Sequence, residues 1–199
     1  MIWREYIKMI KSTEDYRYYI EQDRLALGKE YKRPKLIGDE IWKFEILLRR
    51  AEFYNNTSQK NILKVFLKFY YGYRYYRKRI KFGISIPLNT FREGLSIAHI
   101  GNIVVNGNAR IGKNCRIQEG ITIGATNGMK EAPVLGDNIY IGSGAKIIGN
   151  IKLADDVAIG ANACVVKDVK EKAITIGGVP AKKISENSSH SNLSSMLKL

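Results

Sequence analysis

A six-residue apolar period in the middle of the chain restricts the possible folds more than any other feature of the sequence. From Val105 to Val165, every sixth residue is apolar without exception. A helix repeats its apolar face every 3.6 residues and a single strand every second residue, so neither keeps a strict period of six over this distance. A short strand followed by a tight turn, repeated many times, does keep it.

A second set of small or aliphatic residues runs two positions before the first set. It extends from Ile97 to Val169 and fails only at Asn127 and Pro133. Glycine follows the first set at five positions, where a corner leaves little room for a Cβ atom. These are Gly112, Gly124, Gly136, Gly142 and Gly160. Because no single rung buries its apolar residue alone, the rungs must stack, and the pattern predicts a hexapeptide parallel β-helix.

The composition fits one good core with a small appendage. The chain has 199 residues, shows no apolar segment typical of a signal peptide at its start, and has no run long enough to cross a bilayer. Both cysteines, Cys115 and Cys164, fall inside the repeat, which favours a buried small hydrophobe at Cys115 over a disulfide or a nucleophile. We therefore expect a cytoplasmic protein.

Charge divides the chain near residue 82. Residues 1–82 contain 20 Lys and Arg against 10 Asp and Glu, whereas residues 83–199 contain 13 against 9. We expect a basic α-helical domain over residues 1–82, a β-helix domain over 83–184, and a flexible Ser- and Asn-rich tail over 185–199.

Within the basic domain, the sequence predicts helices over residues 14–27, 40–54 and 61–80, the second capped by Asp39. The third helix contains aromatic residues at a spacing that suits packing, and a dense basic run over residues 74–81. We interpret this run as a solvated helix face. An anionic partner, such as a membrane surface or an acidic glycan, is the alternative. Nucleic acid is disfavoured because no binding motif accompanies the run.

His99 is the most informative single residue of the sequence. It occupies a position where the six-residue register, read back from Val105, requires an aliphatic residue. Imidazole titrates near neutral pH, so a general base is the functional interpretation, and a hydrogen-bonded histidine at the rim of the coil is the alternative. His190, the other histidine, lies in the polar tail and is expected to take no part.

Residues 124–134 keep the six-residue count but interrupt the apolar pattern. We expect an exposed loop pushed out from a corner of the coil, because loops on rigid scaffolds often contain binding residues. A merely irregular rung is the alternative.

Five segments together resemble the left-handed β-helix acyltransferases, and the serine acetyltransferase branch in particular. They are residues 95–105, 121–126, 141–150, 159–163 and the closing Gly-Val-Pro-Ala-Lys at 178–182. The resemblance covers about residues 83–184, and the helices before it resemble a shortened form of that family's helical domain. It implies a mainly β protein, a left-handed parallel β-helix with an N-terminal α-helical domain, similar to proteins of capsule and surface-polysaccharide synthesis.

The resemblance also implies a reaction. Acetyl-CoA, as co-substrate, and an acceptor hydroxyl would meet in a groove between the subunits of a homotrimer, alone or paired into a dimer of trimers, with no metal. His99 matches the catalytic histidine, which takes the hydroxyl proton as oxygen attacks the thioester. The coenzyme would contact Gly142, Ser143, Ala145, Gly160, Ala161 and Ala163, with Lys167 and Lys182 near its phosphates.

Three departures from the family pattern concern the acceptor. The matching positions contain Ile84 instead of an aspartate, Ala98 instead of the aspartate before the histidine, and Glu131 instead of an arginine. The groups that would bind a zwitterionic serine are therefore absent there, which favours a sugar hydroxyl of a surface polysaccharide or its precursor. L-Serine is the alternative acceptor, and a decayed scaffold that only binds is the non-enzymatic alternative.

Three rungs make one coil, so Glu119 is expected one full turn above residue 101. We expect Glu119 or a backbone carbonyl to orient the imidazole of His99, and a solvated corner residue is the alternative for Glu119. Asn89, Asn102 and Thr126 are the candidates for contacts with the acceptor.

Overall fold

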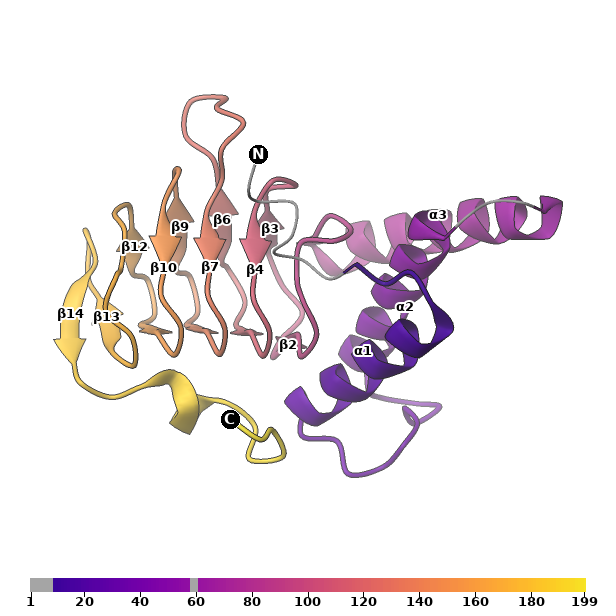
Figure 1. Cartoon of the computed structure of the whole chain (residues 1–199), viewed down its shortest axis with the longest axis horizontal. Helices are drawn as coiled ribbons and strands as arrows, with labels where there is room; N and C mark the ends of the chain where they lie inside the picture. Colours follow the sequence, from indigo (N-terminus) through magenta and orange to yellow (C-terminus); the bar gives the residue numbers. More distant parts are fainter. Residues whose placement is uncertain (1–8, 58–60) are drawn as a thin grey trace.

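The computed structural model describes residues 9–57 and 61–199. Three helices come first: α1 (Thr13–Ala26), α2 (Glu40–Asn56) and α3 (Ile62–Phe82). They pack at one end of a stack of short strands (Figure 1). α1 begins with a capping box between Ser12 and Asp15, and α3 begins at Asn61, whose side chain accepts a hydrogen bond from the Lys64 amide.

Fourteen short strands follow within the described chain. They are β1 (Ile84–Ser85), β2 (Ser96–Ile97), β3 (Ile103–Val105), β4 (Arg110–Ile111), β5 (Arg116–Ile117), β6 (Thr122–Gly124), β7 (Val134–Leu135), β8 (Tyr140–Ile141), β9 (Lys146–Ile148), β10 (Lys152–Leu153), β11 (Ala158–Ile159), β12 (Cys164–Val165), β13 (Thr175–Gly177) and β14 (Lys182–Ser185).

The strands form three sheets, which we name by their first strand. The β1 sheet has the order β1-β3-β6-β9-β12, the β4 sheet β4-β7-β10, and the β2 sheet β2-β5-β8-β11-β13-β14. Each strand pairs in parallel with the strand one coil later, and only β13 and β14 pair antiparallel. The chain is therefore a left-handed parallel β-helix, as the sequence predicts.

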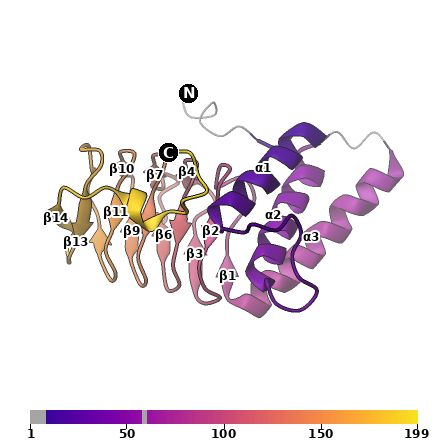
Figure 2. The same cartoon turned by 90° about the horizontal axis from the view of Figure 1, so that it is seen from below.

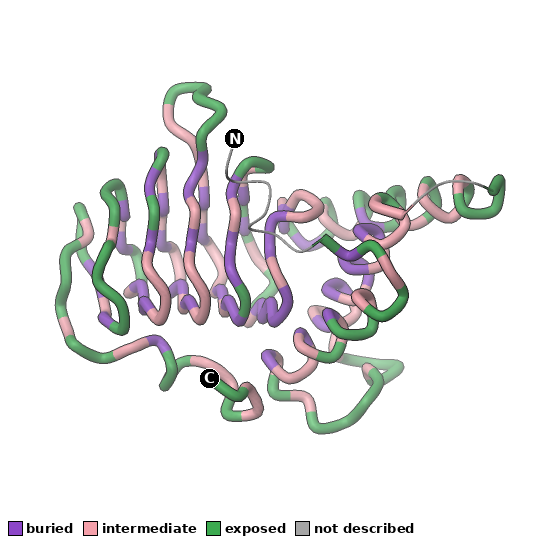
Figure 3. The backbone as a smooth tube through the Cα atoms, viewed as in Figure 1, coloured by how far each residue is buried: buried purple, intermediate pink, exposed green. Residues whose placement is uncertain are grey.

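The register explains how a strict period of six passes through an irregular coil. Val105 pairs with Ile123, three rungs later, but Ile123 pairs with Ile147, four rungs later. The additional rung is the loop that rises above β6 (Figure 1). Met129 lies in this loop and is 59% exposed, so the prediction of an exposed loop over residues 124–134 is confirmed, and Met129 keeps the period of six without being part of the core. The other ten residues of the set are buried, and they form the interior seen in Figure 3.

The packing of α3 differs in part from the prediction. The sequence predicts packing through aromatic residues that include Phe66, Phe69 and Tyr73, but these three side chains are exposed. Two other aromatic residues, Tyr75 and Phe82, make the contact instead, and their rings pack against Phe44 of α2.

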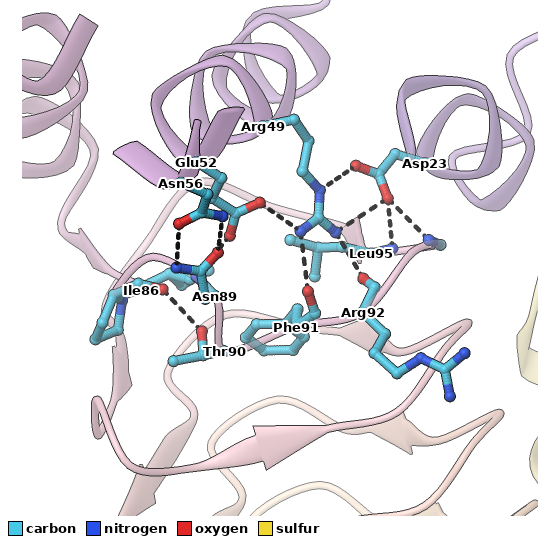
Figure 4. A network of polar contacts seen from close by, with 12 residues as sticks. Asp23, Arg49, Glu52, Asn56, Ile86, Asn89, Thr90, Phe91, Arg92 and Leu95 are labelled. Atoms are coloured by element: carbon cyan, nitrogen blue, oxygen red, sulfur yellow. Dashed lines mark hydrogen bonds and ion pairs between the residues drawn. The ribbon is translucent and has the colours of Figure 1, made fainter. Parts of the chain in front are cut away.

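A buried polar network joins the helices to the first coil of the β-helix (Figure 4). The Arg49 guanidinium donates to the Asp23 carboxylate at 2.8 Å, to Glu52 at 3.0 Å, and to the carbonyl oxygens of Phe91 and Arg92. Asp23 in turn accepts from the backbone amide of Leu95 at 2.9 Å. The helices therefore pack directly on the first coil through buried hydrogen bonds and are not joined to it by a linker alone.

The segment after Ser185, which the sequence predicts to be flexible, makes specific contacts. It runs back along the β-helix toward the helices (Figure 2) and includes a short 3-10 helix, η2 (Ser189–Asn192). The Ser189 amide donates to the Asp156 carbonyl at 3.1 Å, and His190 Nε2 lies 2.8 Å from Asp156 Oδ1. His190 therefore belongs to the attachment of the tail.

Candidate functional site

One edge of the β-helix brings several predicted site residues into line. We call it the His99 corner: the stacked turns that lead from the β2 sheet to the β1 sheet, made by residues 98–102, 118–121, 142–145 and 160–163. The Gly144 amide donates to the Glu119 carbonyl at 2.9 Å, and the Asn162 amide donates to the Ser143 carbonyl at 2.8 Å. Turns of successive coils therefore lie directly above one another.

His99 lies in the first turn of this corner and is exposed on the single chain. The strand before it is held on both sides: the Ala98 amide donates to the Ile117 carbonyl at 2.9 Å, and the Ile97 amide donates to the buried Glu45 carboxylate at 2.8 Å. In the described part of the chain, no group hydrogen-bonds the imidazole. Its backbone is fixed by neighbours, whereas its ring faces outward.

Glu119 lies one coil above, as the count of three rungs predicts. A Cβ atom on Gly101 would lie 2.9 Å from the Glu119 Cβ, which places the two turns in contact. The Ser143 hydroxyl donates to Glu119 Oε1 at 2.7 Å and thereby lowers the pKa of this carboxyl, to which the nearby charge of His99 adds. Glu119 Oε2 is buried and has no hydrogen-bond partner among the described residues.

Most of the residues expected at the coenzyme lie on the same corner. Gly142, Ser143, Gly160 and Ala161 succeed one another up the stack, and a Cβ atom on Gly142 would lie only 2.7 Å from the Ala161 amide nitrogen. The corner is therefore built from small residues that let successive turns stack closely. Two further candidates, Ala145 and Ala163, belong to these turns but are fully buried, so neither presents a surface to a ligand on the single chain.

The two lysines expected near the coenzyme phosphates lie at different corners of the β-helix. Lys182 begins β14 and pairs with Gly177 at the end of the β2 sheet, close to the top of the His99 corner. Lys167 follows β12, so it lies at the next corner, between the β1 and β4 sheets.

The three residues predicted to contact the acceptor also lie at different corners of the β-helix. Asn102 is exposed at the His99 corner. Asn89 lies at the other end of the β1 sheet, where its amide side chain pairs with that of Asn56 and its backbone amide donates to Glu52. Thr126 lies at the base of the loop after β6, also beyond the far end of that sheet. Within one chain only Asn102 shares a corner with His99.

A pocket beside the His99 corner was not predicted from the sequence. It lies between the α1–α2 connection, the start of α2 and strand β2, and it includes the neighbours of His99 on both sides, Ala98 and Ile100. Its charged residues are Lys29, Asp39, Glu40 and Arg116. Nothing in the local sequence indicates this pocket, because its two walls come from distant parts of the chain.

Two buried groups near this pocket lack partners. Trp42 lines the pocket with its indole nitrogen Nε1 unpaired in the described structure, and Glu45 Oε2 is buried and unpaired as well. Asp39 accepts from Lys29 Nζ at 2.7 Å and from the Tyr31 hydroxyl at 2.8 Å, which holds the pKa of its carboxyl far below the usual range. Asp39 therefore orders the wall of the pocket and does not cap α2 through its side chain as predicted.

No protein-family model matches the chain. Curated relatives include the serine acetyltransferase of Mycobacterium tuberculosis, 38% identical over 112 residues, which is 55% of this chain and 48% of the relative. The serine acetyltransferase of Helicobacter pylori is 38% identical over 98 residues, 48% of this chain and 57% of the relative. The chain spans about half the length of the curated relatives that it matches.

Solved structures extend the similarity to the helices. The soybean serine acetyltransferase apoenzyme aligns with a TM-score of 0.67 at 25% identity, over 86% of this chain and 69% of that one. The Neisseria gonorrhoeae serine acetyltransferase in complex with serine aligns with a TM-score of 0.58 at 29% identity, over 85% and 69%. The fold and these similarities support the β-helix acyltransferases as the class of protein.

Within that class, the similarity is to serine acetyltransferases. The predicted closeness to proteins of capsule synthesis is not supported by these relatives.

Proposed function

We propose that this chain is an acetyl-CoA-dependent O-acetyltransferase with His99 as the general base and L-serine as the acceptor. The observation that carries the proposal is the His99 corner, where an exposed imidazole, a carboxylate and a row of glycine and small residues share one edge of a rigid β-helix. The similarity to serine acetyltransferases supports both the reaction and the acceptor.

The chemistry requires little more than proximity and a base. The unprotonated imidazole of His99 takes the proton of the acceptor hydroxyl while the oxygen attacks the thioester carbon. When the tetrahedral intermediate collapses, the carbon–sulfur bond breaks, and the leaving thiolate takes the proton back from the imidazolium. The products are the acetyl ester and free coenzyme A, and no covalent acyl-enzyme is needed.

The coenzyme would lie along the His99 corner. A serine acetyltransferase of Brucella abortus with the same fold was solved in complex with coenzyme A, at a TM-score of 0.66 and 24% identity over 88% of this chain and 70% of that one. In this chain, the small residues Ser143 and Ala161 reach the surface of these turns and leave room for a narrow pantetheine arm, while Gly142 lets the turns stack closely. The Lys182 ammonium would stabilise the phosphates at the far end.

The pocket beside His99 supports serine against the sugar hydroxyl that the sequence favours. The matching motif positions lack a cation and an anion, but the pocket contains both, in Arg116 and Glu40. A zwitterionic amino acid needs one group of each sign, one for its carboxylate and one for its ammonium. A sugar hydroxyl is the second candidate, because Ile84, Ala98 and Glu131 depart from the family pattern.

A second copy of the chain would complete the site. His99 and Asn102 are exposed on the single chain, while Asn89, Thr126 and Lys167 lie at a different corner. In a homotrimer, the His99 corner of one subunit would face the next subunit, which would enclose the imidazole and exclude water.

The deciding experiment measures coenzyme A release by the purified full chain with L-serine and, separately, with a panel of sugars. We expect turnover with L-serine, and a fall of about 10²- to 10⁴-fold in kcat/KM for His99→Asn without a change in Tm. His190→Asn is the matched control and should retain wild-type turnover. Wild-type turnover in His99→Asn would refute the mechanism. Failure of coenzyme A to raise the Tm would favour a non-enzymatic scaffold.

A further inference from the structure

The outer side of α3 contains a continuous row of large apolar residues that the rest of the described chain does not cover. Six of them follow one another at alternating intervals of four and three residues, and each is 56 to 85% exposed. They are Ile62, Phe66, Phe69, Tyr73, Tyr76 and Ile80. We call this row the α3 stripe. Scattered exposed apolar residues are ordinary, but a continuous row marks an interaction site.

The fold of the chain does not use the α3 stripe. α3 is anchored through its opposite side, where Tyr75 and Phe82 are buried against Phe44, and the Tyr75 hydroxyl donates to the Ile86 carbonyl at 2.6 Å. The helix packs on α2 as far back as Tyr71, which stacks on Tyr54, and its first turns extend beyond the other elements (Figure 1). The stripe borders α2, because three of its six residues line a pocket with Ala51, but its side chains remain open to solvent.

The width of the apolar surface distinguishes between kinds of partner. Leu63 and Tyr70 are also exposed, and they lie beside the stripe. At 100° per residue, the exposed apolar arc from Tyr76 to Leu63 spans about 140°. A coiled-coil seam with one partner helix is narrower than this, whereas a helix lying in the surface of a bilayer buries a broad arc.

Charge gives the second, independent indication. α3 contains seven cations and no acidic residue. The cations are Lys64, Lys68, Arg74, Arg77, Lys78, Arg79 and Lys81. By the helical period, Arg77 and Lys81 flank the stripe on one side and Lys68 flanks it on the other. Arg79 also lies on that second side, but its guanidinium donates to the Ser85 hydroxyl at 2.7 Å. A second copy of α3 would bring like charges together on both flanks, so self-association through this helix is disfavoured.

The side chains on one flank are already arranged for an interface between water and lipid. The Arg74 guanidinium lies 5.5 Å from the centre of the Tyr70 ring, and that of Arg77 lies 5.9 Å from the centre of the Tyr73 ring. Tyrosine and arginine each combine an apolar body with a polar tip, which suits the headgroup level of a membrane. Only Lys78 among the cations forms an ion pair within the described chain, with Glu40 at 3.3 Å.

We propose that α3 docks this protein on an anionic lipid bilayer. The α3 stripe inserts at the boundary between headgroups and acyl chains, and the flanking arginines and lysines contact lipid phosphates. No described helix has the length and apolar character that crossing a bilayer requires. The predicted anionic partner of the basic run is thereby specified, because a soluble polyanion would use the cations and leave the apolar arc in water.

Cosedimentation of the full chain with vesicles tests the proposal. We expect the chain to pellet with vesicles made of equal parts of phosphatidylserine and phosphatidylcholine, and to remain in solution with phosphatidylcholine alone. The double substitution F66S/F69S should lower the partition coefficient at least tenfold. The double substitution R74E/R77E should lower it about 25-fold or more, at about five-fold for each cation lost.

Two matched variants and one assay control these results. L36S/I37S removes two other exposed apolar residues, and K32E/K170E makes the same charge change elsewhere, so both should bind the vesicles like the wild type. Coenzyme A release should be unchanged in F66S/F69S, which separates docking from the proposed reaction.

Three outcomes would overturn the proposal. The first is failure of the wild type to pellet with the anionic vesicles. The second is that F66S/F69S binds the vesicles as strongly as the wild type does, and also binds heparin or duplex DNA as strongly. This result would indicate a surface for soluble polyanions. The third is a concentration-dependent doubling of mass that F66S/F69S abolishes, without vesicle binding, which would assign the stripe to a second copy.

Discussion

At the scale of single residues, the Glu119 carboxylate is the group that most directly affects the proposed base. It is stabilised in its ionised form by Ser143 and lies within electrostatic reach of His99. In Glu119→Gln the negative charge that would stabilise the imidazolium formed during proton transfer is gone. We expect kcat/KM to fall about tenfold at neutral pH. Glu131→Gln, in the loop after β6, is the control and should leave kcat/KM unchanged.

Glu45 gives a second prediction, this time on stability. Burial raises the pKa of its carboxyl well above the usual value of 4.5, and the charge of Asp23 raises it further. At a pH between the usual pKa of the unfolded chain and the raised pKa of the folded chain, Glu45 holds a proton in the folded chain and releases it on unfolding. The contribution of Glu45 to stability is therefore largest at low pH and falls as pH rises. Glutamine keeps the acceptor for the Ile97 amide but does not titrate.

The Tm of Glu45→Gln relative to the wild type should therefore increase from pH 5 to pH 8. Glu186→Gln, which changes an exposed carboxyl, should show no such trend. A constant difference between Glu45→Gln and the wild type across this range would show that Glu45 is ionised in the folded chain throughout.

At the scale of elements, the Arg49 network predicts how firmly the helices are attached to the coil. Arg49→Met would leave Asp23 and Glu52 buried without their cation, which costs about 3–5 kcal/mol. Urea unfolding followed by circular dichroism measures the loss. Arg50→Met removes the neighbouring, half-buried arginine and should cost less than about 1 kcal/mol. Similar losses in both variants would show that the network contributes little.

Elements built by local repetition could be predicted from the sequence, and those built by distant contacts could not. Each rung buries its own apolar residue against the rungs next to it, so a period of six identifies the β-helix. The pairing of Arg49 with Asp23 on another helix, and with the backbone of the first coil, follows no period. Periodicity also shows that α3 is amphipathic, but not that its stripe remains open to solvent.

The candidate site shows the same limit. Counting three rungs to a coil places Glu119 above residue 101 correctly, because the first coil is regular. The same period does not show which of the three corners a residue occupies, and Lys167 and Asn89 lie at a different corner from His99. The pocket that contains Trp42 has no sequence signal, since its walls come from different elements.

At the scale of the whole molecule, exposed apolar residues beside His99 indicate where a second subunit would pack. Ile100 is 48% exposed at the His99 corner, and Val104 is 41% exposed on the outer face of β3. In a homotrimer these side chains would be buried together with the imidazole, and a buried charge would be costly.

We therefore expect Val104→Lys to change the mass measured by light scattering from three chains of 22.6 kDa to one, and to abolish coenzyme A release. Leu36→Lys, at a residue that is 94% exposed in the α1–α2 connection, should remain trimeric and active. Because the α3 stripe contains neither Ile100 nor Val104, F66S/F69S should also remain trimeric. A monomeric wild type with full turnover would show that one chain forms the complete site, and the proposed role of the neighbouring subunit would then be wrong.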